Sequence, residues 1–154
     1  MRRFLILTTT LLCCSTITKA QSTYNRAIGV KFPAGFSISY KKFLTETNNA
    51  EAQVTLWNKG FRVSGLYEFN FHSFNTEGLA WFVGPGAHIG FWKDTYQKDY
   101  NSKVDLGIDG VIGLDYKFSN APINVSLDWQ PSVTLVGSAG FTPSYGGIGV
   151  RYTF

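Results

Sequence analysis

The feature that most constrains this chain is an alternation of apolar residues with polar or small ones, repeated along most of its length. The segment 104–118 is the clearest case, with Leu106 and Ile108 on one face and Asp105 and Asp109 on the other. Successive side chains of a strand point to opposite faces, so this pattern predicts strands with one apolar face. Eight such runs occur, at 24–32, 36–44, 50–57, 61–71, 79–92, 104–118, 123–135 and 144–154.

The number and length of these runs predict an all-β fold, an eight-stranded antiparallel up-and-down barrel. The runs exceed the roughly 5–6 residues of an ordinary strand and suit the roughly ten tilted residues that cross a bilayer. Aromatic residues make up 16% of the chain and charged residues only 16%, which excludes a disordered chain. Two barrels fit the alternation: a soluble one with an apolar interior and a transmembrane one with a polar interior.

The polar face favours the transmembrane barrel, because its charged residues alternate with glycine. Glycines leave room inside a narrow eight-stranded barrel for long basic side chains that neutralise carboxylates. The predicted interior is nearly balanced in charge, as a closed polar core requires, and the lumen is expected to be plugged by charge pairs. The predicted interior charges are Lys31, Lys41, Glu51, Arg62, Glu68, Asp105, Asp109, Asp115, Lys117, Asp128 and Arg151.

Aromatic residues gather near the ends of the predicted strands, as in the girdles that mark the two lipid interfaces of a transmembrane barrel. An aromatic core of a soluble barrel is the alternative, and alternation alone does not separate the two. The residues assigned to the girdles are Tyr40, Trp57, Trp81, Trp92 and Trp129.

The first twenty residues form a separate unit. A basic start (MRR), an apolar stretch (FLILTTTLLCC) and a small residue at Ala20 predict a signal peptide, cleaved to leave one barrel domain at 21–154. A lipoprotein is disfavoured, because Leu12 stands directly before Cys13, where a lipobox has a small residue. Cleavage removes both cysteines and leaves 11 basic against 10 acidic residues, so the charge gives no argument for nucleic-acid binding.

The chain ends in VRYTF, an alternating strand that stops on an aromatic residue. In this and in its architecture it resembles the small eight-stranded outer-membrane barrels of Gram-negative bacteria, such as outer membrane protein X and the transmembrane domain of outer membrane protein A. The resemblance implies insertion by the barrel-assembly machinery, whose C-terminal signal is matched at Val150, Tyr152 and Phe154. The stretches GLYEFNF, GPGAHIGFW, GIDGVIGLDYKF and INVSLDWQP are similar to uncharacterised small barrel proteins.

This topology puts both termini in the periplasm and the connections at 33–35, 58–60, 93–103 and about 136–143 outside the cell. Pro85 interrupts the fifth run, because proline lacks the N–H that a sheet ladder needs. We therefore expect a β-bulge at Gly84–Gly86, which would reverse the facing of the residues after it, His88 included.

No catalytic, cofactor or metal site is predicted. His72 and His88 are well separated, which argues against zinc. The pair His72–Ser73 is similar to the serine and histidine of lipid-modifying barrel enzymes, but it falls in a predicted periplasmic turn. The spacing of Asp105, Asp109 and Asp115 fits one strand face and not a calcium-binding loop.

The expected role is therefore structural or interactive, either as a solitary component of the outer membrane or as an accessory subunit of a complex. The expected partners are outer-membrane lipid, the assembly machinery and a possible outer-membrane protein. The alternative is a narrow, porin-like channel for small solutes, in which Arg62, Arg151 or Asp109 would line water. A lipid-modifying enzyme is the third possibility.

Overall fold

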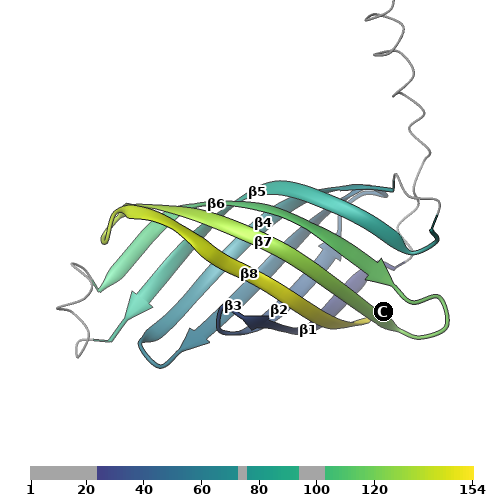
Figure 1. Cartoon of the computed structure of the whole chain (residues 1–154), viewed down its shortest axis with the longest axis horizontal. Coiled ribbons are helices and arrows are strands. Elements are labelled where there is room, and N and C mark those ends of the chain that lie inside the picture. Colours follow the sequence, from purple (N-terminus) through teal and green to yellow (C-terminus); the bar gives the residue numbers. More distant parts are fainter. Residues whose placement is uncertain (1–23, 73–75, 94–102) are drawn as a thin grey trace, which may run out of the picture.

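The structure is a closed eight-stranded antiparallel barrel (Figure 1). It is a computed structural model that describes residues 24–72, 76–93 and 103–154. The predicted signal peptide at 1–20, Ser73 and most of the 93–103 connection lie outside the described residues. The strands are β1 (Arg26–Pro33), β2 (Phe36–Phe43), β3 (Asn48–Trp57), β4 (Gly60–Phe71), β5 (Leu79–Trp92), β6 (Val104–Lys117), β7 (Ile123–Val136) and β8 (Gly140–Thr153).

Each strand pairs with its neighbours in the chain, and β1 pairs with β8 to close the barrel. The closing register runs from Ala27 opposite Thr153 to Pro33 opposite Gly147. Beyond it, the backbone N–H of Arg26 donates to the carbonyl of Phe154 at 2.9 Å, and the reverse bond has the same length. The start of β1 and the end of the chain therefore meet at one end of the barrel, called here the terminal end; the other end is the loop end.

Burial alternates residue by residue, most regularly along β4. The interior is mainly polar, and the buried apolar side chains that cluster there are Leu66, Phe82 and Val111. Large apolar side chains such as Ile108 and Leu127 are more than half exposed. No helix of the described residues is long and apolar enough to cross a membrane.

The expected bulge at Gly84–Gly86 is wrong. The register between β5 and β6 runs without a shift from Leu79 opposite Tyr116 to Phe91 opposite Val104. On the β4 side the paired positions skip only the two residues opposite Gly84 and Pro85, and the register is the same before and after the gap. The missing proline N–H therefore opens a local gap in the ladder without adding a residue. The facing of β5 is kept, and His88 is buried inside.

The irregularities lie instead in the last three strands. The register shifts near Leu106 and Gly107 between β6 and β7, and between Gln130 and Ser132 where β7 pairs with β8. The last strand also begins at Gly140, earlier than the predicted start at 144. Proline and several glycines hide the alternation in this part of the chain, which is why the sequence pattern indicates a loop there.

Candidate functional site: a charged interior

The interior holds ten of the eleven charged side chains expected there. Each of the ten is at most 8% exposed, although they come from seven different strands. Lys117 is the exception, because it is the last residue of β6 and its ammonium donates to the carbonyls of Phe118 and Ala121 at 2.5 and 2.8 Å. The ten buried groups are Lys31, Lys41, Glu51, Arg62, Glu68, Asp105, Asp109, Asp115, Asp128 and Arg151.

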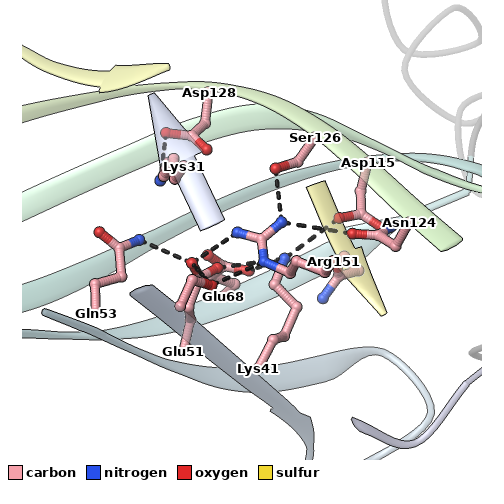
Figure 2. A network of polar contacts seen from close by, with 12 residues as sticks. Lys31, Lys41, Glu51, Gln53, Glu68, Asp115, Asn124, Ser126, Asp128 and Arg151 are labelled. Atoms are coloured by element: carbon pink, nitrogen blue, oxygen red, sulfur yellow. Dashed lines mark hydrogen bonds and ion pairs between the residues drawn. The ribbon is translucent and has the colours of Figure 1, made fainter. Parts of the chain in front are cut away.

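Arg151 lies at the centre of a set of contacts in the terminal half of the barrel (Figure 2). Its Nη2 is 2.7 Å from Glu51 Oε1, its Nη1 donates to Ser126 Oγ at 2.7 Å, and its Nε donates to Ser39 Oγ at 2.8 Å. Ser39 in turn donates to Glu51 Oε1 at 2.7 Å. The guanidinium is thus fixed by partners on three other strands, which is what a buried arginine requires to offset its desolvation.

Lys41 lies next to this arginine and faces three carboxylates. Its Nζ is 2.9 Å from Glu68, 3.5 Å from Glu51 and 3.4 Å from Asp115. It also lies over the Phe82 ring, 4.5 Å from the centroid. One ammonium thus links β2, β3, β4 and β6 across the lumen.

Tyr24 and Asn124 complete this half of the interior by donating to Asp115. The Asn124 amide donates to Oδ2 at 2.6 Å, and the Tyr24 hydroxyl donates to the same oxygen at 3.2 Å. Burial and the nearby Asp115 charge raise the pKa of the Tyr24 hydroxyl, so it stays a donor at neutral pH. We call Lys41, Glu51, Glu68, Asp115 and Arg151 the terminal-side network.

A separate ion pair lies beside this network. Lys31 Nζ is 2.8 Å from Asp128 Oδ1, and both side chains are at most 4% exposed. In Figure 2 the pair lies apart from the residues around Arg151. It ties β1 to β7, across the closing strand β8.

The loop half of the interior contains a smaller group, Arg62, His88 and Asp109, called here the loop-side cluster. Arg62 pairs with Asp109, and His88 Nδ1 is 2.9 Å from the same carboxylate. The Arg62 guanidinium lies over the Tyr145 ring at 4.0 Å, and its Nε donates to Ser64 at 3.1 Å. A cavity of about 10 Å³ next to Arg62 has room for about one water molecule.

Two of the residues assigned to the aromatic girdles face inward, so that part of the expectation is wrong. Trp57 and Trp92 both stand opposite Gly60, on the same face as the buried Arg62. Their rings stack with centroids 5.8 Å apart, and the Trp92 indole N–H donates to Asp105 at 2.5 Å. Trp57 and Trp92 are the last residues of β3 and β5, and both strands end at the loop end of the barrel. Their inward-facing rings therefore cover the lumen at that end.

The other three assigned girdle residues face outward. Tyr40 and Trp129 are 36% and 52% exposed, and the Trp81 ring stacks on the outward-facing Phe71 with centroids 4.4 Å apart. The three residues that match the terminal assembly signal, Val150, Tyr152 and Phe154, are about half exposed on the outer face.

The histidines and aspartates singled out in the sequence are divided among separate contacts. The described residues contain no group of three His, Cys, Asp or Glu side chains that could hold a metal ion. Asp105, Asp109 and Asp115 share a strand face but bind different partners. His72 lies just beyond β4, where burial lowers its pKa.

Three features of the interior and the wall escaped the sequence interpretation. The burial of Phe82 among charges is visible in the parity of β5, because Phe82 precedes Pro85 and adjoins Trp81, which was expected to face outward. The bond between His88 and Asp109 depends on the same parity. The third feature is Arg26 and Lys42, whose positions in the alternation place them on the outer face.

Comparison with known protein families, with characterised proteins and with solved structures gives no match to this chain.

Proposed function

We propose that this chain is an integral outer-membrane β-barrel of a Gram-negative bacterium, with a structural or interaction role and a plugged lumen. The observation that carries the proposal is the polarity of the wall: charged side chains are buried and large apolar side chains are exposed. In water this arrangement would leave an apolar surface far larger than soluble monomers usually expose. In a membrane, the same apolar surface would contact the acyl chains of the lipid, as the outer face of a transmembrane barrel does.

The closed backbone supports a membrane location. A barrel leaves no unpaired strand edge, so its wall satisfies its backbone groups internally, which lipid requires of any spanning structure. The strands have 8–14 residues, lengths that lie on both sides of the roughly 9–11 tilted residues that cross the hydrocarbon core.

Filling of the interior supports the plugged lumen. Lys41 and Arg151 are 0% and 1% exposed, so little space remains for water around either cation. A conducting pore would instead leave charged groups hydrated along a continuous path. No observation favours the narrow channel, which is retained as an outcome of the conductance test below.

The membrane location is tested by expressing the full chain in a Gram-negative host, separating the membranes and running the protein on detergent gels with and without boiling. We expect it in the outer membrane, starting at Gln21, with a boiled form that migrates differently from the unboiled form. Recovery as a water-soluble protein without detergent would contradict the proposal. The matched control is a soluble lipocalin-type barrel of similar size, which should need no detergent.

The plugged lumen is tested by recording conductance across planar bilayers after the barrel has inserted. We expect no steady channel, because the charges inside the wall are bound to each other. A stable, large conductance would contradict the plug and support the channel.

The choice between a solitary protein and a subunit is tested by purification in a mild detergent. A partner recovered in a fixed ratio to the barrel would identify an accessory subunit. Recovery of the barrel alone would favour a solitary structural role.

A further inference from the structure

Arg26 and Lys42 form an unusual pair on the outer wall. They are the charged residues that face outward from the eight strands, all of which the structure describes. The register sets them directly opposite each other on β1 and β2. The N–H of Phe43 donates to the carbonyl of Asn25, so these two opposite residues form a hydrogen-bonded pair. Hydrogen-bonded and non-hydrogen-bonded pairs alternate along an antiparallel ladder, so the next pair, Arg26 and Lys42, is not hydrogen-bonded. Such pairs have Cα atoms only about 4.5 Å apart.

Two like charges in this position repel each other. Neither side chain forms an ion pair or a side-chain hydrogen bond with a described residue. An anion between the two would remove the repulsion and gain two charge-assisted hydrogen bonds. The charge and position of the pair are therefore suited to an anionic group at the terminal end of the barrel.

An apolar groove begins at Lys42. Its volume is about 600 Å³, and its walls include Tyr40 on one side and Tyr67 on the other. The floor between these tyrosines is made of small residues, because the register places Ala52 and Gly65 beside Tyr40 and places Ala50 between Lys42 and Tyr67. The Asn48 amide donates to the Tyr67 hydroxyl at 3.1 Å, which fixes the orientation of that wall.

The anion site and the groove together match the two parts of a phospholipid. We infer that the outer wall over β1–β4 binds one phospholipid with a negatively charged headgroup, its phosphate between Arg26 and Lys42 and one acyl chain in the groove. This inference rests on the proposed membrane location. Outward aromatic residues such as Phe71 and Trp81 lie at the same end of the barrel, which is where headgroups are found in a membrane barrel.

A second copy of the chain fits this surface less well. A two-fold contact places the same patch of both copies face to face. A two-fold contact centred on this surface would bring the Arg26–Lys42 pairs of the two copies together and increase the repulsion between like charges. A lipid phosphate brings the opposite charge.

The test is native mass spectrometry of the full mature barrel released from detergent after incubation with phosphatidylglycerol or with phosphatidylcholine. We expect one retained phosphatidylglycerol per barrel and much less phosphatidylcholine. The double variant Arg26→Gln/Lys42→Gln should weaken retention of phosphatidylglycerol roughly tenfold or more, since each cation near an anionic lipid contributes on the order of 1 kcal/mol. The matched control, Lys59→Gln/Lys93→Gln, removes the same charge at the loop end and should change nothing.

A second variant tests the groove without touching the cations. A Cβ at Gly65 would have no heavy atom within 4 Å, so Gly65→Leu fills the groove without a clash at its first atom. It should displace the acyl chain and reduce phosphatidylglycerol retention by a similar factor. Every variant is first checked for the shift on boiling, so that only folded barrels are compared.

Equal retention of the two lipids by the wild type, or unchanged retention in either variant, would overturn the lipid site. A dimer without bound lipid would also overturn it and assign the groove to a second copy. A wild-type barrel that does not insert into membranes would overturn the proposed function itself. The insertion assay therefore separates the two failures.

Discussion

In the terminal half of the barrel Arg151 and Lys41 bind three carboxylates, whereas in the loop half Arg62 and His88 share the carboxylate of Asp109. The terminal half is tightly enclosed, with Arg151, Lys41, Glu51 and Glu68 at most 2% exposed. The loop half has a small cavity beside Arg62 and two register shifts in its wall. The terminal half therefore depends on a dense network for its closure, whereas the loop half tolerates irregular strands and a space of about one water molecule.

The largest effect is expected from Arg151→Ala. The change removes every contact of the guanidinium and leaves Glu51 buried with only Lys41 as a cationic partner, which should cost about 3–5 kcal/mol of unfolding free energy. Urea unfolding of the detergent-refolded barrel measures it. Lys93→Ala is the control, since it removes an exposed cation just beyond β5 and should leave the unfolding free energy within about 0.5 kcal/mol. Equal losses in the two variants would contradict the importance of the network.

Arg62→Ala should have a smaller effect than Arg151→Ala. Asp109 keeps the hydrogen bond to His88, and the neighbouring cavity lets a water molecule replace part of the guanidinium. We expect a loss of about 2 kcal/mol, measured by the same unfolding series. A loss as large as that of Arg151→Ala would show that the two halves are equally rigid and would remove the contrast between them.

Gly107→Ala tests how closely the loop-side wall is packed. A Cβ at this position would meet the Val133 carbonyl and lie 2.5 Å from His88 Cε1, so we expect a loss of about 1–3 kcal/mol. Gly65→Ala is the matched control, because its Cβ would point into open space on the outer face. A neutral Gly107→Ala would mean that the register shift nearby lets the strand move aside.

The smallest effect concerns the pH dependence from His72. Burial lowers its pKa below the ordinary value of 6.5, so the unfolded chain binds the proton more tightly than the folded barrel. Stability should therefore decline slightly as the pH falls through about 6.5, and the change should be small because the ring is partly exposed. His72→Gln should flatten this part of the stability profile. An unchanged profile in the variant would assign the dependence to other groups.

Alternation was sufficient to predict the eight strands, the closed antiparallel barrel and the faces on which most charges lie. Because side chains alternate along a strand with a period of two, knowing which face one residue occupies fixes the face of every other residue in that strand. Arg151 and Glu51 could therefore be assigned to the barrel interior from the sequence alone. The same parity already puts Trp57 with Thr55 on the inward face. Its assignment to a girdle followed its residue type instead, and was wrong for that reason.

The partners inside the barrel could not be predicted in this way. Alternation assigns a residue to a face but not to a height across the lumen, and the pairing of Lys31 with Asp128 depends on the tilt and stagger of distant strands. Pro85 shows a second limit. The loss of its N–H can be absorbed by a bulge or by a gap in the ladder, and local sequence does not distinguish the two.

The unequal strand lengths have a consequence for the surrounding bilayer. β1 and β2 have 8 residues each, whereas β5, β6, β7 and β8 have 14. At about 3.3 Å per residue, one side of the wall is nearly twice as long as the other. In the proposed membrane setting, the thinnest lipid lies beside β1 and β2, and the barrel axis leans to share the mismatch between its two sides. The protein would then impose a lasting asymmetry of thickness on its lipid neighbours, with Arg26 and Lys42 on the thinner side.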